Sequence, residues 1–415
     1  MSNNKAMLTA KCRSVQAIYE VFIKYLMKRP ESSVVNRQGA VKAIPMALKK
    51  DGVNKVIIIT DPGLVKCGVI DKITPYIEEA GIEYDVYGNC MPEPSIARIN
   101  ECLDFVKSHD AEAIIAVGGG SSMDTAKICM ALHATDKDYP IESLVGNSKV
   151  TPKVKKSMLP LYAVPTTSGT GSEATTCAVA SDPETHKKYT IQDAILLPKR
   201  VFIDVDLMMS LPASITAATG MDALTHAVES YLGVYYGSRE TDLNGLKAVR
   251  LIMRSLKTAC EDGTNVKARQ DMATGSYLAG VAFTTAAVGY AHSFAHSAAM
   301  IHRLPHGVLT SIMLPELLEY YYEGAQPKLA MLARAAQCTS ADRTEAEQAR
   351  DFIEAVKKLR DDIHLQTKLP AMSDLEIEEL CERSLAEANP VYPVPVLMDM
   401  DDARAFVKRV SEPVA

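Results

Sequence analysis

Four of the nine histidines lie within fifteen residues of one another: His292, His296, His302 and His306. Imidazole serves in proteins as a metal ligand and as a proton carrier. His292 and His296 are four residues apart and would share one face of a helix. A straight helix would separate His292 from His306 by about 21 Å. Because Pro305 interrupts a helix, we expect the chain to reverse there and to bring His306 back toward His292.

A second candidate pair, Asp222 and His226, precedes this cluster by some seventy residues. Its i, i+4 spacing lets a carboxylate and an imidazole reach one cation. With the later histidines it forms a mixed oxygen and nitrogen set, which suits Fe²⁺ or Zn²⁺ better than Ca²⁺ or Mg²⁺. The alternative is a helix-start aspartate and a hydrogen-bonded core histidine. The sequence has no HExxH motif, which argues against a zincin-type protease.

A glycine-rich loop follows the apolar run at residues 113–117, which is expected to be a buried strand. Gly118, Gly119, Gly120 and Ser121 let the backbone turn sharply, and a helix is expected to start there. Ser121 and Asp124 fit a capping box at that start. Free backbone N–H groups at a helix N-terminus suit a phosphate. The loop is neither GxGxxG nor a P-loop, so a tight turn without a ligand is the alternative.

Two further features favour a dinucleotide. Residues 165–174 follow another expected strand, at 159–164, and hold five hydroxyls and two glycines; they include Thr166, Thr167 and Thr170. Asp61 ends the expected strand at 55–61. An acidic residue there accepts hydrogen bonds from ribose hydroxyls and repels a 2′-phosphate, which favours NAD over NADP. The alternatives are a plain surface loop and an Asp-Pro-Gly turn.

The composition restricts the class of protein. The chain has 415 residues, of which 47% are hydrophobic and 23% charged, as in soluble globular proteins. A net charge of −6 argues against general nucleic-acid binding. The nine cysteines form no CxxC pair, and reduced thiols without a secretory signal suggest the cytoplasm. The uncharged stretch 272–302 contains histidines and many hydroxyls, so we expect buried helices there rather than a membrane span.

Two segments of different character follow one another along the chain. Up to about residue 205, short β-branched runs alternate with helical patterns such as 65–80 and 95–109, which predicts a doubly wound α/β domain. After about residue 206 the patterns are helical. The expected helices are 212–232, 241–260, 267–282, 315–322, 326–337 and 345–359.

The first thirty residues form a predicted amphipathic helix. Its apolar stripe is made of Val15, Ile18, Phe22, Tyr25 and Leu26, and most of the charges around it are basic. Such a helix can dock on its own chain, on a partner subunit or on another protein, or it can lie on a membrane surface.

Taken together, these motifs resemble the iron-containing (group III) alcohol dehydrogenase family. Four segments carry the resemblance in order: residues 118–127, 165–173, 220–227 and the pattern His292-x3-His296-x9-His306-Gly307. The resemblance extends over about residues 33 to 400. It implies a dehydroquinate synthase-like fold with an α/β dinucleotide-binding domain at 31–205 and an all-α metal-binding domain at 206–415, after an N-terminal extension at 1–30.

The resemblance also implies roles for individual residues. Asp222, His226, His292 and His306 match the four metal ligands, and His296 matches a histidine that relays the alcohol proton. The cofactor-contacting positions are matched by Asp61, Gly119, Gly120, Ser121, Thr166, Thr167, Thr170 and Lys188, and our expected cofactor-binding set adds Gly118 and Asp124. Lys188 would otherwise pass as one of two solvated lysines. His302 and Arg303, at the expected substrate end, depart from the family, and Arg303 would favour an anionic or strongly polar substrate. The alternative is a surface arginine at the turn.

We therefore expect a homodimeric enzyme that interconverts a primary alcohol and its aldehyde with NAD and Fe²⁺, or alternatively Zn²⁺. Two rivals use the same parts. One is a metal- and NAD-dependent lyase resembling dehydroquinate synthase, which would need more basic residues for its substrate. The other is a transhydrogenase that exchanges hydride between a hydroxy acid and an oxo acid. A non-catalytic scaffold recruited through the N-terminal helix would not need the four metal ligands.

Overall fold

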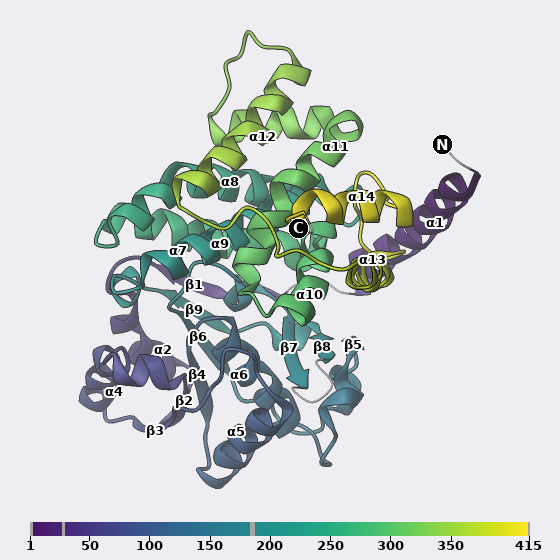
Figure 1. Ribbon diagram of the computed structural model, residues 1–415. Coiled ribbons are helices and arrows are strands. Elements are labelled where there is room, and N and C mark those ends of the chain that lie inside the picture. Colours follow the sequence, from purple (N-terminus) through teal and green to yellow (C-terminus); the bar gives the residue numbers. More distant parts are fainter. Residues whose placement is uncertain (1–2, 27–29, 183–186, 414–415) are drawn as a thin grey trace. The chain divides into compact units, whose positions relative to one another are not determined.

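The computed structural model describes residues 3–26, 30–182 and 187–413 (Figure 1). The chain divides into two compact units. We call Met27–Ser210 the sheet unit, and Met1–Leu26 together with Leu211–Ala415 the helical unit. Within the described ranges, no helix is long and apolar enough to cross a membrane.

The sheet unit is built on a parallel sheet with the strand order β1-β9-β6-β4-β2-β3. The strands are β1 Ser33–Asn36, β2 Lys55–Ile59, β3 Glu83–Tyr87, β4 Ala113–Gly118, β6 Leu161–Pro165 and β9 Arg200–Ile203. In β2 and β4 every residue except Lys55 is buried, as unbroken apolar runs predict for strands covered on both faces. The predicted α/β class of this part of the chain is confirmed.

Helices alternate with the strands of this sheet: α2 Ile44–Lys50, α3 Pro62–Lys66, α4 Thr74–Glu79, α5 Ile96–Ser108 and α6 Gly120–His133. The single helix predicted at 65–80 is wrong, because α3 ends at Lys66 and α4 begins only at Thr74. Gly68 takes a left-handed conformation (φ +67°) between them, and a short 3₁₀ turn at Ile70–Lys72 follows. The helix predicted at 95–109 agrees with α5, and Ser95 caps it by accepting from the amide of Arg98.

A small second sheet was not predicted. It contains β5 Gly146–Asn147 and the antiparallel pair β7 Cys177–Asp182 and β8 Lys187–Gln192. Its strands have mixed polarity, and β8 opens with two lysines, so the apolar pattern of a strand is weak there. The predicted cofactor residue Lys188 lies in β8.

The helical unit contains eight helices after residue 211 within the described ranges: α7 Ala213–Leu232, α8 Arg239–Glu261, α9 Val266–Ala286, α10 Tyr290–His302, α11 His306–Ala336, α12 Glu345–Asp362, α13 Asp374–Ala388 and α14 Met400–Val410. The helices predicted at 315–322 and 326–337 are parts of α11. Within α11, which contains Pro315 and Pro327, only Ala325 departs from helical dihedrals (φ −138°), so the chain is kinked there rather than interrupted.

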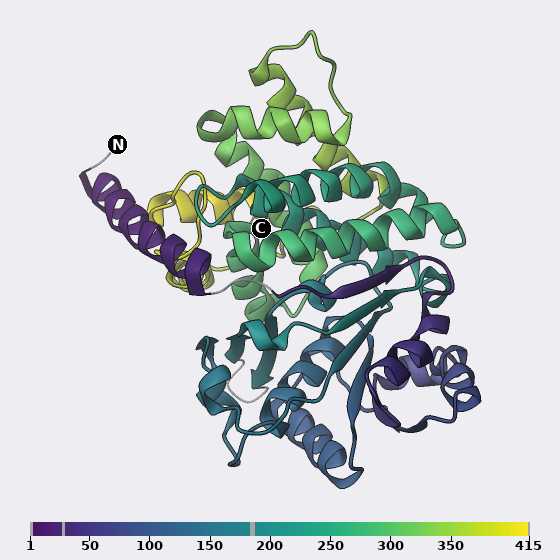
Figure 2. The same ribbon diagram turned by 180° about the vertical axis from the view of Figure 1, so that it is seen from behind.

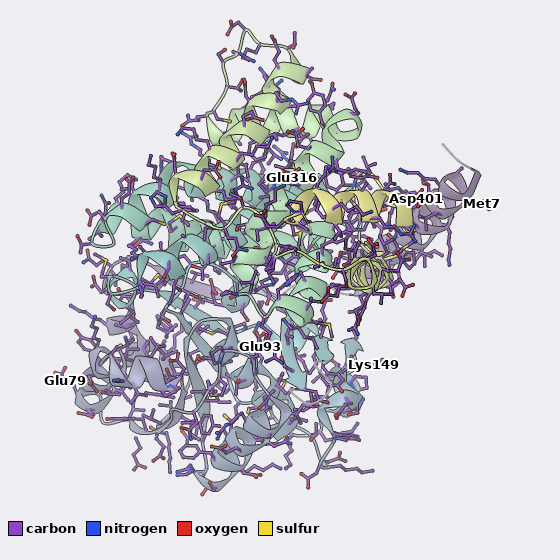
Figure 3. All side chains as sticks on the ribbon, viewed as in Figure 1. Met7, Glu79, Glu93, Lys149, Glu316 and Asp401 are labelled. Atoms are coloured by element: carbon purple, nitrogen blue, oxygen red, sulfur yellow. The ribbon has the colours of Figure 1, made fainter. Side chains whose placement is uncertain are left out.

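The N-terminal helix α1 Asn3–Leu26 belongs to the helical unit and contacts its own chain. Figure 2 shows it beside the C-terminal segment, and Figure 3 labels Met7 and Asp401 in that region. The docked face carries buried Cys12 and Gln16, whereas the predicted stripe residue Ile18 is 70% exposed. The side chains of Phe22, Tyr25 and Leu26 lie outside the described part of the chain. The helix therefore docks through a face different from the one that includes Ile18.

Candidate metal centre and cofactor loops

One face of α7 carries three polar side chains in an otherwise apolar core. Asp222, His226 and Glu229 follow one another at i, i+4 and i+7, and all three are buried. Gly220 lets α7 pack closely on α8, because a Cβ there would lie 2.2 Å from Cδ1 of Leu256. The helix therefore directs its acid and imidazole groups into a closely packed interior.

The two helices that follow bring His292 and His306 together. α10 ends at His302, and Arg303 adopts a left-handed conformation (φ +50°) that turns the chain. Pro305 then occupies the N-cap position of α11, which begins at His306. The ring centroids of His292 and His306 are 5.5 Å apart, so the predicted reversal at Pro305 is present.

The ligand atoms of Asp222, His292 and His306 all lie within 4.8 Å of one another. Oδ1 of Asp222 is 3.4 Å from Nε2 of His306 and 3.8 Å from Nε2 of His292. Ligands of a tetrahedral ion with bonds of about 2.1 Å are about 3.4 Å apart, so these separations come close to the requirement. His226 adjoins the group: its Nδ1 is 3.9 Å from Oδ2 of Asp222, and its ring lies 4.4 Å from that of His292.

The protonation state of His292 also fits a cation. Burial lowers the pKa of His292 to about 3, so its imidazole is neutral at neutral pH. Nδ1 of His292 faces Glu229, and its buried Nε2 has no hydrogen-bond partner among the described residues. This Nε2 faces the Asp222 carboxylate. Because the ring is neutral, Nε2 can ligate a divalent ion without first losing a proton.

Glu229 is a candidate site residue that the sequence interpretation missed. Its carboxylate accepts hydrogen bonds from the amides of Gly289 (2.9 Å) and Ala291 (2.7 Å) and from Nδ1 of His292 (2.5 Å). Burial raises the pKa of Glu229 to about 7. Carboxylates behind ligating histidines fix the ring orientation and the tautomer. The i+7 spacing from Asp222 is the signal that could have revealed it.

We expect Glu229→Gln to weaken metal binding about 10- to 100-fold. An amide can replace one oxygen of Glu229, but its NH₂ group cannot accept the hydrogen bonds that the other oxygen receives. Competition with a chromogenic chelator measures the affinity. Glu240→Gln, at an exposed position near the start of α8, is the matched control and should leave the affinity unchanged. Equal affinities of the two variants would show that Glu229 does not support the site.

His296 lies one turn after His292 on α10 and stacks on His306, with ring centroids 5.2 Å apart and an interplanar angle of 20°. Its Nδ1 is 2.8 Å from Oε1 of Glu387, near the end of α13. The structure therefore places the predicted proton carrier beside the metal cluster and gives it a carboxylate partner that the sequence did not suggest.

In the sheet unit, the two predicted cofactor loops lie side by side because β4 and β6 are neighbours. The amide of Thr166 donates to the carbonyl of Gly118 at 3.0 Å. A Cβ on Gly119 would come within 3.2 Å of Oγ1 of Thr167, and one on Gly120 within 2.8 Å of Cγ2 of Thr170. The N-cap residue of α6 is Gly119, which has no side chain to bind the first amides of the helix. This glycine-lined helix N-terminus is a suitable cradle for a pyrophosphate.

The predicted capping box of Ser121 and Asp124 is wrong, because Gly119 is the N-cap residue and Asp124 points elsewhere. The Asp124 carboxylate accepts from the hydroxyl of Ser172 (2.7 Å) and the amide of Val179 (3.0 Å). Residues distant in sequence therefore bind the Asp124 carboxylate, which would otherwise be available to cap the helix. Asp124 links the start of α6 to the second loop and to β7.

Buried Lys127 joins the same elements. Its ammonium group donates to five oxygens: the carbonyls of Ser172 (2.6 Å), Thr175 (2.9 Å) and Cys177 (2.8 Å), and the hydroxyls of Ser172 (3.1 Å) and Thr175 (3.0 Å). A buried ammonium is tolerated only when it is well compensated by such partners. Lys127 thus fixes the second loop against α6.

Replacing Lys127 with methionine should lower the free energy of unfolding by about 3–5 kcal/mol, because buried acceptors lose their donor. It should also weaken NAD binding, since the second loop loses its anchor. Urea unfolding and NAD titration measure the two effects. Lys149→Met, at an exposed position labelled in Figure 3, should change stability by less than about 0.5 kcal/mol. If both variants were equally stable, Lys127 would not anchor the loop.

The remaining predicted cofactor residues lie apart from the glycine loop in sequence. Asp61 follows β2, the strand next to β4, and caps α3 by accepting from the amide of Leu64 at 3.0 Å. Lys188 pairs with Ser181 across the hairpin, and its ammonium group is 3.7 Å from Oε1 of Glu93. The alternative interpretations, an Asp-Pro-Gly turn at Asp61 and a solvated lysine at Lys188, are both compatible with these contacts.

Two family models match the sequence. The model described as "Iron-containing alcohol dehydrogenase" matches residues 31–205, and "Fe-containing alcohol dehydrogenase family, C-terminal" matches residues 216–409. The chain belongs to the iron-containing alcohol dehydrogenase family. Membership confirms the predicted fold and chemistry: a metal-dependent, NAD-linked oxidoreductase that interconverts alcohols and aldehydes.

Individual relatives and a solved structure agree with this family assignment. Lactaldehyde reductase of Escherichia coli strain K12 is 32% identical over 83% of this chain and 91% of its own length. NAD-dependent methanol dehydrogenase of Bacillus methanolicus is 34% identical over 70% of this chain and 74% of its own. Among solved family structures, the alcohol dehydrogenase from Oenococcus oeni aligns with a TM-score of 0.85 at 32% identity, over 91% of this chain and 98% of that one.

Proposed function

We propose that this chain is an NAD-dependent dehydrogenase of short primary alcohols that holds Fe²⁺, or alternatively Zn²⁺, with Asp222, His226, His292 and His306. The observation that carries the proposal is the convergence of Asp222, His292 and His306, with the neutral His292 ring held by Glu229. A divalent ion at this site supplies Lewis acidity toward the alcohol oxygen. Glu229 orients one ligand, and the turn at Arg303–Pro305 places another.

His296 is the proposed proton carrier. With Nδ1 hydrogen-bonded to Glu387, its Nε2 can accept the hydroxyl proton while the carbinol carbon gives its hydride to NAD⁺. In the sheet unit, amides of Gly118, Gly119, Gly120 and Ser121 are proposed to bind the pyrophosphate. We assign the other contacts with the cofactor to Asp61, Thr166, Thr167, Thr170 and Lys188, whereas Asp124 acts indirectly by holding Ser172.

The substrate class is proposed from the relatives. Lactaldehyde reductase and methanol dehydrogenase are named for two small oxygenated molecules. We therefore propose short primary alcohols as the substrate class. We further propose a cytoplasmic homodimer. Cytoplasmic location is supported by nine cysteines that are all free, as expected of a reducing compartment. Light scattering of the purified protein tests the dimer.

NADH formation under anaerobic conditions, with Fe²⁺ or Zn²⁺ and primary alcohols from ethanol to hexanol, tests the function. We expect NAD⁺ reduction with at least one alcohol, and the reverse reaction with its aldehyde. A transhydrogenase would release no free NADH but would exchange hydride between hydroxy and oxo acids. A lyase of the dehydroquinate synthase type would show no net reduction of NAD⁺. No NADH with any alcohol in metal-loaded protein would contradict the proposal.

A further inference from the structure

The segment around Glu387 touches the proposed proton carrier, and only the hydrogen bond from His296 to the Glu387 carboxylate has been used so far. Oε1 of Glu387 is 2.8 Å from Nδ1 of His296 and accepts from the hydroxyl of Tyr392 at 2.8 Å. His296 and Glu387 side chains are each 32% exposed, so both groups are partly withdrawn from solvent. One carboxylate oxygen thus joins α10 to the segment after α13.

This contact restricts the His296 ring. When Nδ1–H donates to Glu387, the proton is fixed on that nitrogen and Nε2 keeps its lone pair. Stacking on His306 holds the plane of the ring at the same time. Carboxylates that hold a catalytic histidine in this way set its tautomer and compensate its charge when it gains a proton.

The segment that carries Tyr392 is itself held in place by α1. The side-chain amide of Gln16 donates to the carbonyls of Tyr392 (2.7 Å) and Pro390 (3.1 Å), and Arg13 donates to the carbonyl of Pro395 at 2.9 Å. Gln16 is completely buried. A buried amide that binds two backbone carbonyls of one turn fixes the path of that turn. The contacts run from Gln16 through Tyr392 to Glu387 and then to His296.

We propose that Glu387 is the positioning residue for His296, and that Gln16 of α1, acting through Tyr392, keeps Glu387 in place. The inference rests on the proposed function, in which Nε2 of His296 takes the hydroxyl proton while hydride leaves the carbinol carbon for NAD⁺. Nδ1–H stays on its nitrogen, Glu387 stays ionised, and the proton later passes from Nε2 to water. The N-terminal helix is therefore an internal support of the catalytic side chain.

A double-mutant cycle with the full-length, metal-loaded protein tests the inference. We expect Glu387→Gln to lower kcat about 10- to 100-fold, with the KM for NAD⁺ and the bound metal unchanged. In a His296→Ala background the same substitution should change kcat less than about twofold, because a positioning residue acts only through its partner. Tyr392→Phe removes the hydroxyl that donates to Glu387, and it should lower kcat by a smaller factor than Glu387→Gln does.

Two different failures can be distinguished. If His296→Ala loses kcat but Glu387→Gln does not, or if the two losses multiply in the double variant, the positioning role is wrong and the role of His296 stands. If His296→Ala retains kcat, the proposed proton carrier itself is wrong.

A second pair of variants tests the contribution of α1. Gln16→Leu should lower kcat at unchanged metal content, whereas Ile18→Ala, on the exposed face of the same helix, should leave kcat unchanged. Equal effects of these two variants, or no effect of Gln16→Leu, would overturn the support by α1. Metal content and thermal unfolding, measured on every variant, identify losses of kcat that come from misfolding. If Gln16→Leu misfolds, Tyr392→Phe tests the same series of contacts with a smaller change.

Discussion

Asp222→Asn should abolish metal binding and lower kcat/KM at least about 10³-fold, since Lewis acidity contributes several kcal/mol to alcohol activation. The Asp222 carboxylate is 3% exposed and faces ring nitrogens of three histidines. An amide keeps the shape of the side chain but loses its charge and one acceptor atom. Metal analysis and NADH-linked kinetics measure both effects.

The metal-free Asp222→Asn variant should be at least as stable as the metal-free wild type. Burial raises the pKa of Asp222, which means that the ionised carboxyl is disfavoured where it lies, and a neutral amide avoids that cost. Asp401→Asn, at an exposed position of α14 (Figure 3), is the control for a generic loss of charge. Full metal content in Asp222→Asn would remove this residue from the ligand set.

Gly307→Ala should damage both the stability of the helical unit and the metal site. A Cβ at Gly307 would lie 2.2 Å from the carbonyl oxygen of Ala218 on α7 and 2.6 Å from its carbonyl carbon. Backbone atoms inside a helix cannot move aside as a flexible side chain can. The start of α11 must therefore shift away from α7, and His306, the preceding residue, must move away from Asp222.

We expect Gly307→Ala to lower the free energy of unfolding by about 2–3 kcal/mol or more, as overpacking of a core does. Metal affinity should fall as well. Thermal unfolding with and without metal and chelator competition measure these changes. Gly237→Ala is the matched control, because the nearest atom to its Cβ would be 3.5 Å away, an ordinary contact. Wild-type stability of Gly307→Ala would show that α11 and α7 do not require this close approach.

Sequence patterns correctly predicted the features that depend only on residues close to one another in the chain. The β-branched run at 55–59 forms a strand, because an unbroken run of this kind is typical of a strand that is buried on both faces of a parallel sheet. The i, i+4 pair Asp222 and His226 lies on one helix face, and Pro305 marks the reversal that returns His306. Each of these features needs only backbone geometry within a few turns.

Residues missed by the sequence interpretation depend on contacts between distant segments. Glu387 is 91 residues from His296, and only the packing of α10 on α13 brings them together. Asp124 has the spacing of a capping residue, yet Ser172 and Val179 take its carboxylate. The N-terminal helix docks through buried Gln16, because two backbone carbonyls compensate its amide. Hydrophobic periodicity contains no information about such polar partners.

Metal titration of chelator-treated protein, with NADH-linked activity followed on the same samples, tests the central claim most directly. Under anaerobic conditions, the account predicts one tightly bound Fe²⁺ or Zn²⁺ per chain and activity that rises in proportion to occupancy. Asp222→Asn should bind no ion at this site and remain inactive. Full alcohol-dependent NADH formation in metal-free protein, or in Asp222→Asn, would contradict the account.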